Sequence, residues 1–355
     1  MYNTSSKVLI FFLRNAAVWT VAGFIFNFLR FFGIPESFTT VNFEEFIPLW
    51  TNFLLGFMAA LFYTGIELLF ELPKLKRWSF RTHMIGKLVL SFFAVKFMMV
   101  IAYYTLTFYH GTIALNEMGI IEFLRSKMYW VVLLFFLLTA ALISFIRQVD
   151  QKFGPGIIWN MLRGKYHRPR EEERIFMFID LKSSTTIAEE LGNIRYSKFI
   201  QDCFFDLNDI FPKYDARVYQ YVGDEAVLTW HPQRGLTEHK CIACFEAFSE
   251  RLAEKRDYYI KTYGHAPEFK AGAHAGPIVI TEVGIVKKEL AYHGDVINTT
   301  ARIQSMCNTF DQKLLISQEL LDKLPGKDKL SYAFQSKLQF PDFFLLTEVY
   351  FGTHS

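Results

Sequence analysis

The sequence contains only four cysteines among its 355 residues, Cys203, Cys241, Cys244 and Cys307. All four lie in the second half of the chain, so the sequence implies no disulfide framework. Net charge is also small, at +3 from 38 Lys and Arg against 35 Asp and Glu. A nucleic-acid binder that works through bulk positive charge is therefore excluded. We interpret Cys241 and Cys244 as buried thiols on a helix, because no second pair or ligand set accompanies them.

Charged residues make up only 21% of the chain, whereas 52% is apolar and 39 residues are phenylalanine. Disordered chains are poor in apolar residues and rich in charge, so disorder is excluded. The phenylalanines are concentrated before residue 150. This uneven distribution favours a membrane module joined to an ordinary soluble domain over a purely soluble enzyme.

Four long apolar stretches occur at about 8–32, 46–70, 84–109 and 128–146. Each is long enough to cross a hydrocarbon core of about 30 Å as a helix. We therefore expect a membrane domain of four helices over residues 1–146. The first stretch is not expected to be a cleavable signal, because Arg14 and Asn15 interrupt it early and no small-x-small cleavage site follows.

The distribution of basic residues between these stretches predicts their orientation. The loop at 33–45 contains three glutamates and no Lys or Arg. Basic residues instead follow the second and fourth stretches, at Lys74, Lys76, Arg77, Arg81, Arg147, Lys152, Arg163, Lys165, Arg168 and Arg170. We expect a multi-pass protein of the inner or cell membrane, with both termini and the soluble half in the cytoplasm.

Charged residues inside the apolar stretches have different predicted surroundings. Arg14, Glu67 and Lys87 lie within a few residues of the predicted cytoplasmic ends, where long side chains can reach the interface. Lys96 lies near the middle of the third stretch, close to the bilayer centre at 1.5 Å per residue. Either a backbone carbonyl or polar neighbour pairs with Lys96, which we favour, or Lys96 contacts a ligand or ion.

A connector at residues 147–170 separates the two halves. Gly154-Pro155-Gly156 breaks any helix that leaves the membrane, and apolar residues at helical spacing over 157–162 predict a short amphipathic helix. From residue 171 strands and helices alternate, which predicts an α+β domain. Strands are expected at 174–180, 216–222, 225–231, 268–275, 277–285, 313–316, 331–338 and 344–351, and helices at 183–191, 195–211, 236–262, 295–308 and 318–324.

Two local patterns in this half combine carboxylates with turns. Asp180 ends a buried strand, and the hydroxyl residues 183–186 follow at a helix N-terminus. A carboxylate for Mg²⁺ beside backbone N–H groups suits a metal-bound phosphate, although the same pattern also serves as a simple helix cap. Asp224 lies in a predicted hairpin between two alternating strands. It is either a second metal carboxylate or only a turn residue, and we expect Glu225 to face the solvent or a pocket rim.

A third pattern places Asn298 and Arg302 four residues apart, so both project from one helix face. An amide and a guanidinium on one face can orient a sugar and hold a phosphate. The alternative is a polar pair that faces the solvent, and the pattern by itself favours that alternative.

Together these patterns resemble the class III nucleotidyl cyclase catalytic domain, the family of adenylyl and guanylyl cyclases. The resemblance runs from about Arg174 to Tyr350. Its segments, in family order and spacing, are Phe178-Ile-Asp-Leu-Lys-Ser-Ser-Thr185, Tyr221-Val-Gly-Asp-Glu225, Gly272-Ala-His-Ala-Gly-Pro277 and Gly294-Asp-Val-Ile-Asn-Thr-Thr-Ala-Arg302. It implies a ferredoxin-like α+β catalytic domain at 171–355 that works as a homodimer with shared active sites. The four-helix anchor also resembles that of bacterial membrane-bound members.

The resemblance assigns roles to individual residues. By match to the family motifs, two Mg²⁺ or Mn²⁺ ions per active site would be held by Asp180, Asp224 and the main-chain carbonyl of Leu181. Asn298 and Arg302 would stabilise the transition state from the partner subunit. The phosphates would be cradled by Ser183, Ser184 and Thr185. The implied reaction is attack of the ribose 3′-oxygen on the α-phosphorus, with pyrophosphate leaving.

Two positions depart from the family pattern for reading the base. Gln220 stands where many adenylyl members have Lys, and Ala291 stands where they have Asp or Thr. Guanylyl members usually have Glu and a Cys or Ser there. A glutamine can serve either purine edge, and alanine offers no side-chain contact. The family preference favours ATP, which predicts a membrane-bound adenylyl cyclase that makes cyclic AMP.

Two alternatives to this function remain. One is a guanylyl or dual-specificity cyclase, and the other is a catalytically weak nucleotide-binding regulator. The expected partners are ATP, a second copy of the chain and the lipid bilayer, without nucleic acid. A stimulus or regulator is not identified by the sequence.

Overall fold

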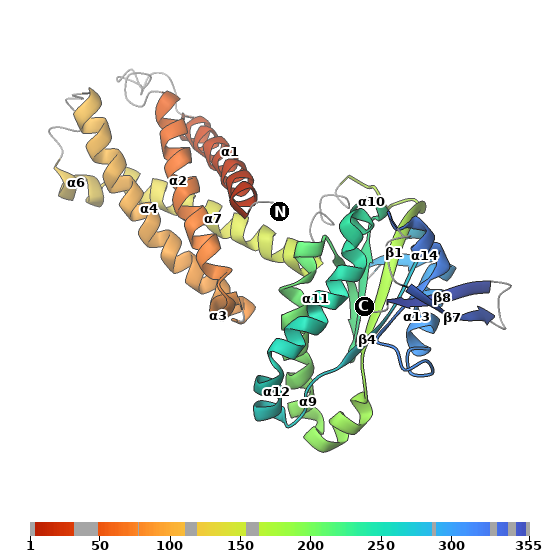
Figure 1. Cartoon of the computed structure of the whole chain (residues 1–355). Coiled ribbons are helices and arrows are strands. Elements are labelled where there is room, and N and C mark those ends of the chain that lie inside the picture. The colour runs from red at the N-terminus through yellow and green to blue at the C-terminus, as the bar shows by residue number, and fades with distance from the viewer. Residues whose placement is uncertain are drawn as a thin grey trace. The chain divides into compact units, whose positions relative to one another are not determined.

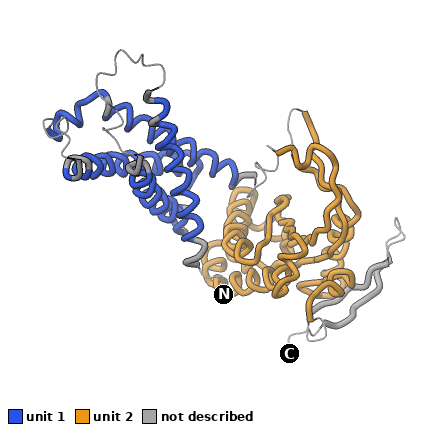
Figure 2. Tube along the Cα trace, turned by 90° about the horizontal axis from the view of Figure 1, so that it is seen from above, with its two compact units in different colours: residues 1–153 blue, residues 154–355 orange. Residues whose placement is uncertain are grey.

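The computed structural model describes residues 4–31, 49–76, 78–110, 119–153, 163–285, 289–326, 332–339 and 346–352. The chain divides into two units, residues 1–153 and 154–355 (Figure 2). The expected division into 1–146, 147–170 and 171–355 stays a prediction. The helix expected at 157–162 lies outside the described residues.

The first unit is built from long helices. Four helices of the described chain are long and apolar enough to cross a membrane, which confirms the number expected from the sequence. The bounds are α1 Thr4–Phe31, α2 Leu49–Phe70, α4 Phe80–His110 and α7 Lys127–Phe153, with two short helices, α3 Pro73–Lys76 and α6 Ile120–Arg125 (Figure 1).

Aromatic side chains hold this bundle together. The ring of Trp19 on α1 stacks on Phe136 of α7 with centroids 5.9 Å apart, and it meets Tyr63 of α2 edge-on at 5.6 Å. On the outside, large apolar side chains such as Phe93 and Leu138 are exposed. An apolar outer face is what contact with lipid requires, because hydrocarbon solvates such side chains.

Two charged residues differ from the expectation that they reach the interface. Glu67 and Lys87 are only 5% and 3% exposed, and Lys87 Nζ lies 2.8 Å from Glu67 Oε2. The expectation was wrong because each side chain finds a partner of opposite charge inside the bundle. Lys96 is half-buried, with Nζ 5.2 Å from the ring centroid of Phe92 one turn earlier. That contact is a cation–π interaction, and the ligand alternative stays untested.

The second unit is an α+β domain around one mixed sheet. The strand order is β2-β3-β1-β4-β6-β8-β7, and β5 pairs with β4. The strands are β1 Arg170–Leu181, β2 Arg217–Val222, β3 Glu225–Trp230, β4 Phe269–Val283, β5 Glu289–His293, β6 Leu314–Ser317, β7 Tyr332–Gln339 and β8 Leu346–Gly352. The helices of eight or more residues are α9 Ser184–Asn208, α11 Lys240–Glu254, α12 Arg256–Tyr263 and α13 Asp295–Ser305, and the shorter helical elements are η3 Phe211–Tyr214, α10 Pro232–Gly235, η4 Thr237–His239 and α14 Gln318–Lys323.

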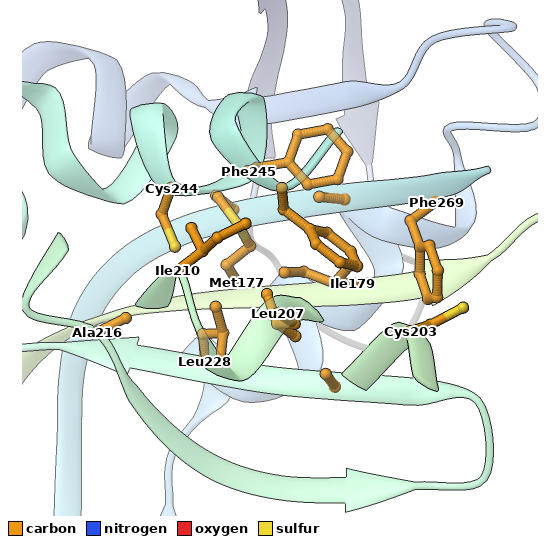
Figure 3. Close-up of a cluster of buried hydrophobic side chains, with 14 of the residues drawn as sticks. Met177, Ile179, Cys203, Leu207, Ile210, Ala216, Leu228, Cys244, Phe245 and Phe269 are labelled. Atoms are coloured by element: carbon orange, nitrogen blue, oxygen red, sulfur yellow. The ribbon is translucent and has the colours of Figure 1, made fainter. Parts of the chain in front are cut away.

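The central strand β1 separates two hydrophobic layers, because successive side chains of a strand point to opposite faces. Met177 and Ile179 pack into the layer that contains α9, α11 and α12 (Figure 3). Phe176 and Phe178 pack into the layer that contains Val296 of α13. Figure 1 shows α11 and α13 on opposite faces of the sheet.

The four cysteines are buried and free. This confirms the interpretation of Cys241 and Cys244 as buried thiols on a helix, here α11. Burial raises the pKa of both thiols to about 12, so neither is a ready nucleophile or metal ligand at neutral pH.

Three expected elements differ from the structure. The helix expected at 236–262 is interrupted, because Lys255 between α11 and α12 has φ −96° and ψ 9°. The two strands expected at 268–275 and 277–285 form the single strand β4. Pro277 does not interrupt it, because the register of the described residues pairs Pro277 with Glu173 of β1 alone, and the missing N–H is tolerated at an open edge. Strand β5 was not expected.

Candidate active site

Two carboxylates meet where β1 ends. Asp180 is paired with Glu225 in the β1–β3 register, so Asp224, at the tip of the β2–β3 hairpin, is adjacent to it. Burial raises the pKa of Asp180, and the charge of Asp224 raises it further. The structure thus brings together the two predicted metal carboxylates. Their mutual repulsion is what a bound cation would relieve.

Glu225 adds a third carboxylate beside them. It is half-buried, and burial together with the charges of Asp180 and Asp224 raises its pKa to about 7. The sequence predicted a position in the solvent or at a pocket rim; the side chain is half-buried, and the rim stays a prediction. Among the described residues, no group of three or more His, Cys, Asp or Glu side chains is arranged to hold a metal ion. The hard oxygen ligands of the kind that Mg²⁺ and Mn²⁺ prefer are therefore the pair Asp180 and Asp224.

The predicted phosphate loop follows directly after β1. Ser183 has a left-handed backbone with φ 58° and ψ 31°, and α9 begins at Ser184. Lys182 N donates to Glu268 O at 2.8 Å and fixes the start of the turn. The first N–H groups of a helix have no intrahelical acceptor. The segment 183–185 therefore presents free N–H groups beside Asp180, which is the arrangement that binds anions.

Three residues around the carboxylates were missed by the sequence analysis. Lys270 on β4 is the register partner of Asp180, is 6% exposed, and counteracts the rise in the Asp180 pKa. A lysine between small and apolar residues of a buried strand was the signal that could have identified it. Gln304 on α13 donates from Nε2 to Asp180 Oδ2 at 3.4 Å.

Tyr196 is the third missed residue. Burial together with the Asp224 charge raises the pKa of Tyr196 to about 12. Tyr196 therefore lies close to the hairpin that carries Asp224. Local sequence carried no signal for this contact, because Tyr196 lies beyond the non-helical Gly192 inside α9.

Asn298 and Arg302 project from α13, as predicted. At about 100° per residue, Gln304 lies about 200° around the helix from Arg302. Asn298 is exposed and Arg302 half-buried, whereas Gln304 is 8% exposed. Helix α13 thus turns Gln304 towards Asp180 of its own chain and presents the two candidate transition-state residues on another face.

The two positions expected to read the base lie on different strands. Gln220 is exposed on β2, directly after an irregularity in the β2–β3 register, and Ala291 is half-buried on β5 opposite Thr281. Their neighbours Tyr219 and Tyr292 meet with ring centroids 4.6 Å apart. This contact joins β2 to β5. Gln220 and Ala291 are the immediate chain neighbours of the two tyrosines in contact.

Close packing of α13 on β4 depends on Gly272. A Cβ atom there would lie 2.3 Å from Gln304 N and 2.6 Å from Gln304 Cα, which no real contact allows. We expect Gly272→Ala to displace α13, to lower any catalytic rate at least tenfold, and to destabilise the unit by about 1–3 kcal/mol. The measurements are turnover and the melting temperature of the full-length protein.

Gly276→Ala is the matched control on the same strand. A Cβ at Gly276 would lie 3.4 Å from Val296 Cγ2, which is close to ordinary contact. Equal losses in the two variants would contradict the account of the α13 packing.

A family model for the adenylate and guanylate cyclase catalytic domain matches residues 167–340. The chain carries a class III cyclase domain. Its solved neighbours include a bacterial light-regulated adenylyl cyclase, at 16% identity and a TM-score of 0.54, with 64% of this chain and 67% of that chain covered. That likeness shows the fold alone. Cyclase domains of this class use divalent metals, and the donor set around Asp180 and Asp224 fits them.

Two curated relatives are similar in sequence to the cyclase domain. Adenylate cyclase 2 of Rhizobium meliloti (strain 1021) is 36% identical over 193 residues, which is 54% of this chain and 53% of that protein. Guanylate cyclase 2D of Rattus norvegicus is 24% identical over 165 residues, or 45% of this chain and 14% of that protein. The chain therefore spans about half the length of the Rhizobium protein and far less of the rat protein.

Proposed function

We propose that this protein is a membrane-anchored adenylyl cyclase that converts ATP to 3′,5′-cyclic AMP and pyrophosphate. The observation that carries the proposal is the meeting of Asp180 and Asp224 beside the free N–H groups at the start of α9. The 36% identity to a bacterial adenylate cyclase supports the choice of reaction and nucleotide.

In this proposal Asp180, Asp224 and the carbonyl of Leu181 hold two Mg²⁺ or Mn²⁺ ions per active site. When bound, the metals lower the pKa of the ribose 3′-hydroxyl and neutralise the triphosphate. The N–H groups of residues 183–185 bind the phosphates. The positive charge of Lys270 favours the ionised form of Asp180 and so keeps it ready to bind metal.

The active site is proposed to be shared between two protomers. Gln304 ties α13 to Asp180 of its own chain, and Asn298 and Arg302 lie on another face of α13, from which they are proposed to act on the site of the partner. There the Arg302 guanidinium stabilises charge on the α-phosphoryl oxygens, and Asn298 orients the ribose. Such preorganised donors are often the largest single contribution to the rate.

The four-helix bundle is proposed to anchor the cyclase domain in the inner or cell membrane, with both termini in the cytoplasm. The basic residues after α2 and α7 support this orientation, because cytoplasmic loops are enriched in Lys and Arg. A stimulus for the bundle is not assigned.

Base choice provides the test of the adenylyl assignment. We expect purified full-length protein with Mn²⁺ to prefer ATP over GTP, but by a modest ratio. The Gln220 amide can both donate and accept, so it can hydrogen-bond with either adenine or guanine. The wrong base therefore leaves few buried polar groups unpaired. Competition kinetics with both nucleotides, with the cyclic products separated by chromatography, measure the ratio.

Gln220→Lys serves as the comparison variant for base choice. A lysine there is expected to raise the ratio of ATP to GTP turnover, because its ammonium only donates, and N1 is an acceptor in adenine but carries a hydrogen in guanine. If the unaltered protein clearly prefers GTP, the guanylyl alternative replaces the adenylyl assignment.

A further inference from the structure

A polar cluster connects all four long helices of the membrane unit. It consists of Asn15 on α1, Thr64 and Glu67 on α2, Lys87 on α4, and Arg147 on α7. Lys87 Nζ donates to Glu67 Oε2 at 2.8 Å, and Arg147 Nη1 lies 3.8 Å from the same oxygen. Arg147 Nη2 also donates to Asn15 Oδ1. Asn15 Nδ2 in turn donates to Thr64 Oγ1 at 2.8 Å.

Most of the polar cluster is buried in the bundle. Asn15 is 2% exposed, whereas the side chain of Arg147 is 25% exposed, with its guanidinium 4.4 Å from the ring centroid of Phe11 and 5.1 Å from that of Tyr63. The hydroxyl groups of Tyr63 and Ser144 are 3.0 Å apart, which adds a second polar link between α2 and α7. One carboxylate, that of Glu67, therefore serves two cations in a setting where an uncompensated charge is costly.

The polar cluster is incompletely satisfied. Glu67 Oε1 and Arg147 Nη1 are buried and have no hydrogen-bond partner among the described residues. Buried polar groups are normally paired, because each unpaired group loses its interaction with water. One carboxylate is shared between two cations, and one oxygen of Glu67 and one nitrogen of Arg147 make no hydrogen bond. The members of such a cluster can exchange hydrogen-bond partners when the helices shift.

The position of Arg147 links the polar cluster to the rest of the chain. Arg147 lies six residues before the end of α7 at Phe153, and the second unit begins at the next residue, Gly154. Aromatic packing between Trp19, Tyr63 and Phe136 already holds the bundle together at other levels. The charged residues therefore add a specific constraint on α7 rather than bulk cohesion.

We propose that this polar cluster couples the membrane bundle to the cyclase domain. It holds the C-terminal part of α7 in one position relative to α1, α2 and α4, and a shift of any of these helices changes the partners of Arg147. The cyclase domain receives that change through the continuous chain after Phe153. The activity measurement that tests this inference rests on the proposed function, whereas the exchange measurement does not.

The first test replaces Glu67 by glutamine in the full-length protein in membranes. Glu67→Gln keeps the shape of the side chain and leaves Lys87 and Arg147 without their shared anion. We expect kcat for cyclic AMP formation to fall at least about fivefold, which is the low end of coupling between distant sites, with KM for ATP unchanged. Glu122→Gln, at an exposed carboxylate on α6 outside the polar cluster, is the control and is expected to leave kcat unchanged.

A second readout does not depend on catalysis. Hydrogen–deuterium exchange of the amides of residues 147–153 reports how firmly the end of α7 is held. We expect exchange there to accelerate at least about fivefold in Glu67→Gln, as the same lower bound for the lost coupling, with no change in Glu122→Gln or in β4. Unchanged kcat in a correctly inserted Glu67→Gln protein, or unchanged exchange in residues 147–153, would overturn the proposal.

Glu67→Gln with Lys87→Gln covers the case in which the single variant fails to insert. The double variant removes both members of the buried Glu67–Lys87 pair, and Arg147 keeps Asn15 and its two aromatic neighbours. We expect it to insert and still to show faster exchange in residues 147–153. Wild-type exchange in the inserted double variant would overturn the proposal. If the unaltered protein makes no cyclic nucleotide, the proposed function fails, whereas the exchange measurement still decides the role of the cluster.

Discussion

Replacing Asp180 by alanine is expected to lower cyclase turnover at least about a thousandfold, and Asp224→Ala is expected to do the same. Each variant removes a carboxylate from the site proposed to hold both metals, and metal ions supply several kcal/mol of transition-state stabilisation. A thousandfold loss corresponds to about 4 kcal/mol. The measurement is cyclic AMP formation by full-length protein with saturating Mn²⁺ and ATP.

These variants should remain folded. Asp224 raises the pKa of Asp180, so the two charges repel each other in the absence of metal, and removing one relieves that repulsion. We therefore expect the melting temperature without metal to stay the same or to rise slightly. Asp257→Ala, at an exposed aspartate on α12, is the control for an unrelated loss of carboxylate. Near wild-type turnover in either Asp180→Ala or Asp224→Ala would remove the two-metal assignment.

Arg302→Ala is expected to lower kcat by about 10²–10³-fold while KM for ATP changes little. The reason is that a guanidinium aimed at charge that develops in the transition state contributes there and not in the ground state. Asn298→Ala should act in the same sense. Arg256→Ala, at an exposed arginine on α12, is the control. A rise in KM with unchanged kcat would instead assign Arg302 to substrate binding alone.

Sequence periodicity and length were sufficient to predict much of this architecture. The four membrane helices were predicted because each apolar stretch is long enough to cross a bilayer. The strand that ends at Asp180 and the hairpin at Asp224 were predicted because local patterns define a buried strand and a tight turn. The structure then places these two carboxylates together, because β1 and β3 are neighbours in the sheet.

Contacts between residues far apart in the sequence could not be predicted from local sequence patterns. The pair Glu67–Lys87 joins residues 20 positions apart on two helices, and the contact from Gln304 to Asp180 spans 124 positions. The charge of Asp224 acts on Tyr196, which follows the non-helical Gly192 in α9 and is 28 positions away in the sequence. Tertiary packing decides such contacts, and a single sequence carries no signal for it. For the same reason, the sequence predicted one helix at 236–262 and did not predict its interruption at Lys255.

Co-expression of Asp180→Ala with Arg302→Ala tests the shared active site most directly. Each variant alone should be inactive, since both sites of its homodimer lack one group. In a mixed dimer one site carries both defects and the other carries neither, as two-fold symmetry requires. With random pairing, half of the dimers are mixed, so activity should recover to about a quarter of wild type. No recovery, with both variants present in the same complexes, would contradict the account and place the whole site within one chain.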